Sequence, residues 1–163
     1  MKLIESFEIH NLQGKAKINQ RKRLHLNIHD SYSDKSQRLF NSICLESYIQ
    51  PHRHKDSGTE ETLLCLQGEI GIVQFNNCGE VILSRKLVPM KDAMPEKQDA
   101  VCVSWSSDDW HTVISLTSQS LILEIKAGPF NPEEAKQVAD WAPSPSSFLE
   151  AQEYLLDLRS LFL

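Results

Sequence analysis

The sequence predicts an all-β protein whose strands close into a jelly-roll barrel. Three observations between residues 21 and 126 support this fold class: the apolar segments are short, turn residues separate them about every 8 to 12 residues, and no segment keeps the helical period of about 3.6. The chain of 163 residues, with 40% hydrophobic and 24% charged residues, has the size and composition of one domain with its own core.

The N-terminal part of the chain supplies two of the expected strands. A short strand is expected at residues 3–9, followed by a weak helical or turn segment. Residues 21–30 then alternate between apolar and polar side chains, a period of two that is typical of a strand with one polar face. His25, Asn27 and His29 share this face, which either contacts solvent or lines a pocket.

Further strands complete the expected barrel. The clearest turn is NNCG at residues 76–79, where glycine can take positive φ and close a hairpin. Residues 89–98 form a charged connector that contains two prolines. The remaining expected strands are residues 37–50, 62–66, 69–75, 81–88, 99–105, 111–116 and 120–126.

Two helices are expected after the barrel. Residues 131–138 begin with Asn-Pro-Glu-Glu, which offers an N-cap, a proline in the first turn and acids near the positive end of the helix. Ser147 and Glu150 then have capping-box form, and apolar residues recur on one helical face up to the C-terminus. We therefore divide the chain into a domain of residues 1–145 and an amphipathic helix of residues 146–163, which packs on the barrel or on a second subunit of a homodimer.

The segment YIQPHRHKDSGTEETLLCLQG, residues 48–68, contains a set of candidate metal ligands. His52 and His54 are two residues apart, and on an extended strand such residues share one face, so both imidazoles point toward one place. The turn-rich KDSGT lets the chain return, which brings Glu61 beside the histidines. His111, which follows the turn SSDD, is the candidate for the fourth ligand.

These residue types favour one divalent transition metal. A single HxH on a surface usually has no function, but here an HxH, a turn, a glutamate and a distant histidine occur together. Neutral imidazoles and a carboxylate suit Zn, Fe, Mn and Ni alike. The predicted metal ligands are His52, His54, Glu61 and His111.

The same residues carry a resemblance to the cupin superfamily. His52-x-His54 with Glu61 and Gly68 resembles its first motif, and Trp110-His111 resembles its second. Two features differ from the usual pattern: six residues separate the second histidine from the glutamate, and SSDD replaces the Pro-x-Gly turn before the last histidine. The resemblance implies a double-stranded β-helix, the cupin form of the jelly roll, with a metal site inside it.

A narrower resemblance covers residues 16–145, where the chain is similar to the WbuC-family cupin-fold metalloproteins. The matching motifs are Arg21-x-Arg23, Asn27-x-His29, Gln37-Arg38, Pro51-His52-Arg53-His54, Glu61-Thr62, Trp110-His111, EIKAGPF at residues 124–130 and ADWAP at residues 139–143. The resemblance implies the fold and the metal site. Similar proteins are associated with bacterial gene clusters for surface polysaccharides (O-antigens), a context that favours a sugar or nucleotide-sugar derivative but does not identify a substrate.

Three further residues are candidates for catalysis beside the metal. Tyr48 shares the face of the histidines if its strand runs unbroken into them. Glu124 and Lys126 share a face of the last barrel strand and form a salt bridge either in the pocket or at an outer rim. A hydroxyl, a carboxyl and an ammonium group can supply protons or bind anions next to a metal.

Three functions remain open on these residues. The first is a metal-dependent enzyme that acts on a small polar metabolite such as a sugar or nucleotide-sugar in surface-polysaccharide biosynthesis. The second is an Fe(II)-dependent oxygenase, which dioxygen uptake would identify. The third is a non-catalytic module that binds carbohydrate through a metal-centred pocket, which tight binding without turnover would identify.

Composition and charge limit the classes of binding partner and the cellular compartment that we expect for this protein. A net charge of −5 gives no reason to expect nucleic acid or an anionic membrane, so the expected partner is a small molecule. The N-terminus lacks the apolar core of a signal peptide and no stretch is long enough to span a bilayer, so a cytoplasmic location is expected. There the cysteines stay reduced. Cys44, Cys65 and Cys102 are expected in the core and Cys78 in an exposed turn.

Overall fold

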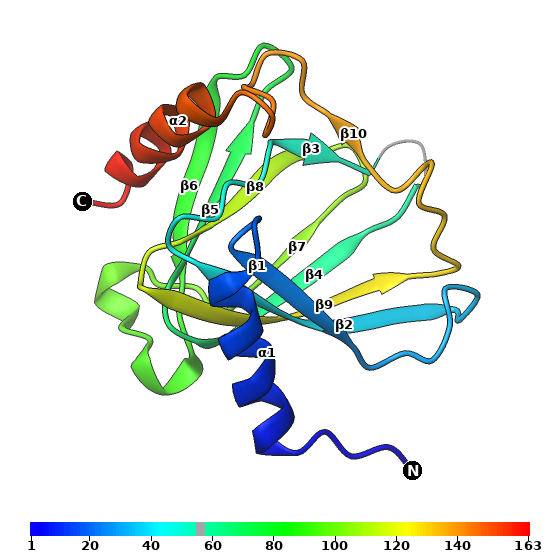
Figure 1. The fold of residues 1–163 in the computed structure, drawn as a ribbon. Coiled ribbons are helices and arrows are strands. Elements are labelled where there is room, and N and C mark those ends of the chain that lie inside the picture. Colours follow the sequence, from blue (N-terminus) through cyan, green and yellow to red (C-terminus); the bar gives the residue numbers. More distant parts are fainter. Residues whose placement is uncertain (55–57) are drawn as a thin grey trace.

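The structure, a computed structural model, describes residues 1–54 and 58–163 and consists mainly of two antiparallel sheets (Figure 1). Each sheet has five strands among the described residues, which confirms the all-β fold class. The first sheet has the order β1 (Arg23–Asn27), β2 (Ser36–Cys44), β9 (Gln119–Ala127), β4 (Glu61–Gln67) and β7 (Cys102–Trp105). The second sheet has the order β10 (Gln137–Val138), β3 (His52–Arg53), β8 (Trp110–Ser115), β5 (Ile70–Phe75) and β6 (Val81–Leu87).

The main hydrophobic core lies between the two sheets, because alternate residues of facing strands point inward. In β4, Leu63 and Cys65 are buried, whereas Leu64 between them is only half-buried. Every residue of β8 is buried, as expected for a central strand that is covered on both faces. The other members of this core are Ile43, Ile49, Ile70, Ile72, Leu87, Trp105, Val113 and Ile122.

The N-terminal segment forms a helix, so the strand expected there is wrong. α1 spans Ser6–Ile18 and lies beside β1 and β2 (Figure 1). The backbone N–H of Glu5 donates to Glu8 Oε2 at 2.8 Å, one half of a capping box that stabilises the first turn. Leu12 and Ala16, four residues apart on one helical face, are buried. The capping and this buried face outweigh the strand-like alternation of the first residues.

The expected C-terminal helix is present. α2 spans Phe148–Ser160 and lies on the outer face of the second sheet (Figure 1). Ala151, Leu155 and Leu158 are buried there in a second cluster with residues of β5 and β8. The apolar face of the helix thus packs on its own barrel, and a homodimer stays a prediction. None of the described helices has the length and apolarity that a membrane crossing needs.

Residues 131–138 do not form the expected helix. The backbone N–H of Glu134 donates to the carbonyl of Asn131 at 3.2 Å in a turn, and the segment ends in β10. β10 pairs with β3, so that Gln137 lies opposite Arg53. Pairing with a strand distant in sequence outweighs the local capping signals, which is how tertiary contacts override helix propensity.

Two connecting segments also differ from simple expectation. The strand expected at residues 37–50 ends at Cys44, because the N–H of Ser47 donates to the Cys44 carbonyl at 3.0 Å in a turn. The connector after β6 contains two short 3-10 helices, η1 (Met90–Asp92) and η2 (Pro95–Lys97). The turn expected at residues 55–59 lies partly outside the described residues.

The four cysteines are free thiols that differ in exposure. Cys44 and Cys65 are buried and Cys78 is exposed, as expected. Cys102 was expected in the core but is exposed, because it lies on β7 at the edge of its sheet. Burial raises the pKa of the Cys65 thiol to about 11, so this group stays protonated at neutral pH.

A thiol reagent should therefore distinguish two pairs of cysteines. We expect dithionitrobenzoate at about pH 8 to modify the exposed Cys78 and Cys102 quickly in the folded protein, and the two buried thiols only after unfolding, because the thiolate is the reactive form. The absorbance of the released thionitrobenzoate measures this. The variant Cys78→Ser should lose one fast thiol, and rapid modification of all four would contradict the burial described here.

Candidate metal centre

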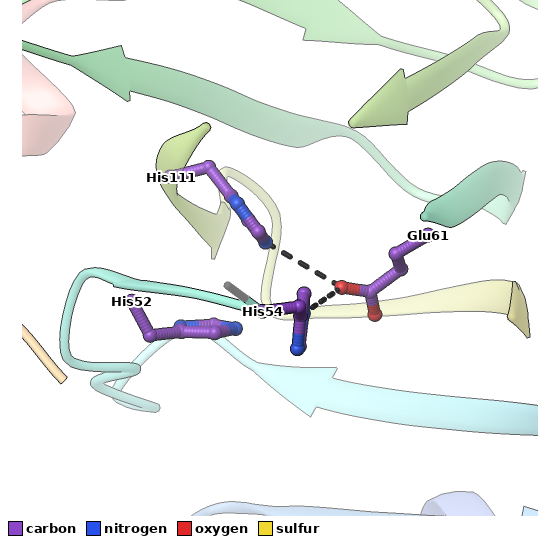
Figure 2. A group of neighbouring side chains, drawn as sticks. All are labelled: His52, His54, Glu61 and His111. Carbon is purple, nitrogen blue, oxygen red and sulfur yellow. Dashed lines mark hydrogen bonds and ion pairs between the residues drawn. The ribbon is translucent and has the colours of Figure 1, made fainter. Parts of the chain in front are cut away.

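The four residues predicted as metal ligands lie together in one buried group (Figure 2). His52 lies on β3, His54 follows it, Glu61 begins β4 and His111 lies on β8. The pairing of β3 with β8 places His52 opposite His111. One ligand atom from each residue lies within 4.8 Å of the other three. No more than 6% of any of these residues is exposed, so bulk water is excluded from the group.

A backbone carbonyl holds the Nδ1 atom of each imidazole. The three pairs are His52 Nδ1 and Gln50 O at 3.0 Å, His54 Nδ1 and Ala135 O at 2.6 Å, and His111 Nδ1 and Asp109 O at 2.8 Å. Because a carbonyl oxygen can only accept, each Nδ1 carries a proton and donates it. The Nε2 atoms are then left as the nitrogens that could bind a metal, the arrangement by which proteins orient histidine ligands.

Two of these Nε2 atoms meet the carboxylate of Glu61. Glu61 Oε2 lies 2.7 Å from His54 Nε2 and 3.4 Å from His111 Nε2 (Figure 2). With the ring protons on Nδ1, the nitrogens and the carboxylate present lone pairs to one another, and contacts this short require a proton or a cation between them. Imidazole and carboxylate donors match the preferences of divalent transition metals, so the residues present fit the predicted ion.

The surroundings favour the protonation states that metal binding requires. Burial lowers the pKa of His52 well below its usual range, and the nearby positive charge of Lys136 adds to this effect. Burial alone would raise the pKa of Glu61, but its close contacts with His111 and His54 and the charge of Lys126 hold it well below its usual range. A neutral imidazole and an ionised carboxylate are the forms that bind a metal.

Trp105 positions one of the ligands. Its ring stacks on His111 with the centroids 4.7 Å apart and the planes inclined by 9°. Trp105 is buried, and it lies opposite Glu61 in the register of β4 with β7. Sequence reasoning missed this role, because a tryptophan on a barrel strand predicts burial in the core and nothing more specific.

Glu124 and Lys126 form an ion pair inside the barrel next to the ligands. Lys126 Nζ lies 2.7 Å from Glu124 Oε1, and their side chains are only 12% and 10% exposed, respectively for Glu124 and Lys126, which excludes the outer rim. Lys126 also lies opposite Glu61 in the pairing of β4 with β9. Burial and the charge of Glu61 raise the pKa of Glu124 to about 7. Burial would lower the pKa of Lys126, but Glu124 and Glu61 raise it, so the ammonium stays charged.

Tyr48, the third candidate for catalysis, is not brought to the metal group. Its ring belongs to the second cluster under α2 and packs edge-on against Tyr154, with the centroids 6.2 Å apart. Its hydroxyl donates to the carbonyl of Pro143 at 2.8 Å. The expected alternation depended on an unbroken strand from residue 37 to residue 50, whereas β2 ends at Cys44. The structure therefore gives Tyr48 a role in packing the helix on the barrel.

A cavity adjoins the metal group. A pocket of about 30 Å³ against His52, Glu61 and His111 shares three lining residues with a cavity of about 270 Å³. The shared residues are Asn41, Glu124 and Lys136. A larger hollow of about 580 Å³, at the C-terminal end of the chain, contains none of the four ligands.

The polar face of β1 lines the same cavity. His25, Asn27 and His29 all contribute to its wall, so of the two alternatives for this face the pocket is confirmed. Asn27 Oδ1 and His29 Nε2 are buried and have no hydrogen-bond partner among the described residues. Such atoms are rare in folded proteins and mark places where a ligand or water completes the hydrogen bonding.

Lys136 is a cavity residue that sequence reasoning missed. It precedes β10 and follows Ala135, whose carbonyl accepts from His54. Lys136 is exposed and lines the cavity; desolvation by the surrounding protein lowers its pKa, while Glu61 and Glu124 raise it in part. The helical pattern of residues 131–138 predicts a lysine on a solvated face, and the structure keeps Lys136 accessible but places it, through the pairing of β10, on the wall of this cavity.

Fold and site together define a cupin-type protein with a buried His/Glu group that could hold a metal ion. The chain belongs to the family described as "Domain of unknown function (DUF6016)", whose model matches residues 4–87. The match includes His52, His54 and Glu61 and ends before His111. No curated protein sequence matches the chain.

Several solved structures share the fold. Protein SO0799 from Shewanella oneidensis has a TM-score of 0.62 at 8% identity, with 96% of each chain covered. A conserved protein with a double-stranded β-helix domain from Klebsiella pneumoniae subsp. pneumoniae MGH 78578 has a TM-score of 0.57 at 12% identity, with 86% of this chain and 99% of that chain covered. TT1209 from Thermus thermophilus has a TM-score of 0.54 at 16% identity, with 78% and 97% covered. The likeness establishes the double-stranded β-helix fold.

Proposed function

We propose that this protein is a metal-dependent enzyme that acts on a small polar metabolite such as a sugar derivative. One observation carries the proposal: the small pocket against the His/Glu group and the larger cavity share Asn41, Glu124 and Lys136, so a ligand in the cavity would be separated from the candidate metal ligands only by these shared residues. The cavity volume of about 270 Å³ is close to the lower end of ligand sites, roughly 300–1,000 Å³. It suits one sugar-sized molecule, and a nucleotide-sugar would leave its nucleotide outside.

The side chains around the cavity divide the chemical tasks. The four candidate ligands would hold a divalent transition ion, which would supply a Lewis acid for an oxygen of the substrate. Glu124, on the wall between metal group and cavity, gives a proton to the substrate or takes one from it. Lys126, 2.7 Å from Glu124, stabilises the carboxylate form with its ammonium charge. The burial of the ligands keeps competing water away from the reacting group.

Substitution of Glu124 tests this assignment. We expect Glu124→Gln to lower kcat by roughly 10²–10⁴-fold, the usual contribution of general acid–base catalysis, while the metal content per chain stays unchanged. Turnover of a panel of sugars and sugar acids by the metal-loaded protein, followed by mass spectrometry, measures the effect. The matched control is Glu96→Gln on the exposed η2, which should keep full activity. An unchanged kcat in Glu124→Gln would remove the residue from the mechanism.

The same assay separates the alternative functions. Consumption of dioxygen in step with product by the iron-loaded protein would assign an Fe(II)-dependent oxygenase. A sugar that binds tightly but is not converted by the Zn, Fe, Mn or Ni forms would replace the enzyme with a carbohydrate-binding module. Either result would leave the metal site intact and change the chemistry proposed for it.

The biological context is a separate part of the proposal. The motifs EIKAGPF and ADWAP and the resemblance to the WbuC family support a role in surface-polysaccharide biosynthesis in the cytoplasm. Deletion of the gene in its native host, followed by electrophoresis of the surface polysaccharide, tests this role. An unaltered polysaccharide would move the substrate to another pathway.

A further inference from the structure

We propose that the cavity beside the metal group binds an anionic oxygen group of the metabolite, a carboxylate or a phosphate, through Lys136, Arg23 and His29. The inference rests on the proposed function, because the cavity is the space that the substrate of this enzyme would fill. It names the chemical class of that substrate. The charge of the lining, two cations without a carboxylate partner among the described residues and the unsatisfied buried Nε2 of His29 support it independently.

Positive charge predominates in the lining of the cavity. Arg21, Arg23, Lys126 and Lys136 contribute to it, and among the described residues Glu124 is its single acidic member. Lys126 is already paired with Glu124 at 2.7 Å, which leaves three cations. The chain as a whole has a net charge of −5, so a basic composition does not explain this concentration of positive charge. The lining therefore attracts anions on an otherwise acidic protein.

Two of these cations have no internal counter-ion in the part of the chain that the structure describes. Neither Arg23 nor Lys136 forms an ion pair with a carboxylate of the described residues. Arg23 Nη1 donates to the uncharged Tyr48 carbonyl at 2.8 Å and Ser47 Oγ at 3.2 Å, and the other guanidinium N–H groups remain as donors. Arg23 is half-buried, and a positive charge held in partly desolvated surroundings costs free energy that an anionic ligand would offset, whereas Lys136 is exposed and keeps its charge in contact with solvent.

His29 offers a directed hydrogen bond in the same cavity. The residue is 5% exposed, and its Nε2 has no partner among the described residues. His29 Nδ1 lies 3.0 Å from the backbone N and 2.9 Å from the carbonyl O of Arg38, so Nδ1 has a partner in either tautomer and Nε2 is the ring nitrogen left for a ligand. In the tautomer that carries its proton on Nε2, this group is a donor that matches a carboxylate or phosphate oxygen.

The position of Lys136 links this subsite to the metal centre. Lys136 lines both the cavity and the small pocket against the ligands. The carbonyl of the preceding residue, Ala135, accepts from His54 Nδ1 at 2.6 Å. An anion held by Lys136 would thus fix the rest of a small metabolite close to the metal ligands, which is how binding energy orients a substrate for reaction.

Calorimetric titration with inorganic phosphate and with succinate tests the proposal. Both anions are added to metal-loaded and to metal-stripped protein in a chloride buffer of constant ionic strength. We expect at least one of them to bind at one site per chain in both forms of the protein. Lys136→Gln should weaken the Kd by about tenfold or more, whereas Lys136→Arg, which keeps the charge, should lose far less. The control is Lys97→Gln on the exposed η2, which should bind like wild type.

The outcomes separate this proposal from the proposed function. No binding of either anion, equal affinity in Lys136→Gln and wild type, or binding that disappears when the metal is removed would each overturn it. Tighter binding of phosphate would identify a phosphorylated metabolite, and tighter binding of succinate a carboxylic acid. Metal content is measured on the same samples. Anion binding by a chain that never takes up metal would support the subsite and refute the metal-dependent enzyme, and metal uptake without anion binding would do the reverse.

Discussion

The variant His54→Ala is expected to purify without the metal that the wild-type protein carries at about one ion per chain. His54 lies at the centre of the group: its Nε2 is 2.7 Å from Glu61, and its Nδ1 is anchored by the Ala135 carbonyl. Removal of an outer hydrogen-bond partner alone lowers metal affinity by about 10–100-fold. The loss of a ligand itself should exceed this range, enough for the ion to be lost on dialysis.

Elemental analysis of protein purified without added metal measures this effect. The matched control is His10→Ala, which removes an exposed histidine of α1 that takes no part in the group. Its metal content should equal that of wild type. A wild-type protein that stays free of metal after reconstitution with Zn, Fe(II), Mn and Ni would refute the metal site. The three imidazoles would then be assigned to proton transfer or to packing.

The variant Leu155→Ala is expected to lose about 2–5 kcal/mol of unfolding free energy, the usual cost of truncating a buried leucine to alanine. Leu155 is 1% exposed and lies in the cluster between α2 and the second sheet. The cavity left by the side chain cannot collapse easily, because β5 and β8 form a rigid wall beneath the helix. Urea unfolding followed by circular dichroism measures the change.

The adjacent leucine supplies the control for this prediction. Leu156 is 60% exposed on the same helix, so Leu156→Ala should change the unfolding free energy of a monomer by less than about 0.5 kcal/mol. A loss in Leu155→Ala no larger than that in Leu156→Ala would contradict the packing of α2 on the barrel. A loss in Leu156→Ala that is large at high protein concentration and shrinks on dilution would instead reveal the homodimer.

The barrel and the grouping of His52, His54, Glu61 and His111 could be predicted because both depend on short-range patterns in the sequence. Alternation along a strand indicates which residues share a face, and His52 and His54 satisfy that rule within three residues. Glu61 and His111 required only that turns return the chain to the same place, and the strand pairing brings them there. A ligand group of this kind can be recognised in a sequence because histidine is an uncommon residue and an HxH pair matches the period of a strand.

The remaining features depend on contacts between distant segments. Residues 131–138 carry real helix signals, but β3 offers an edge to which Gln137 and Val138 pair, and Lys136 reaches the cavity for this reason alone. Tyr48 was assigned to the pocket on the assumption that its strand continues, whereas a turn after Cys44 breaks the alternation. Sequence periodicity contains no information about either event, because both are decided by what lies alongside in the folded chain.

Strand β8 contributes side chains to both hydrophobic clusters, and this restricts the register in which it can pair with its neighbours. His111 and Val113 face the barrel interior, while Trp110 and Ile114 face α2. A shift of one residue would exchange these faces, with Trp110 in the ligand group and His111 in the apolar layer under the helix. The ligand group would then lose an imidazole, and the apolar layer under α2 would gain a polar ring. The C-terminal helix, on the far side of β8 from the His/Glu group, therefore helps to fix the register that keeps His111 aligned with the other candidate metal ligands.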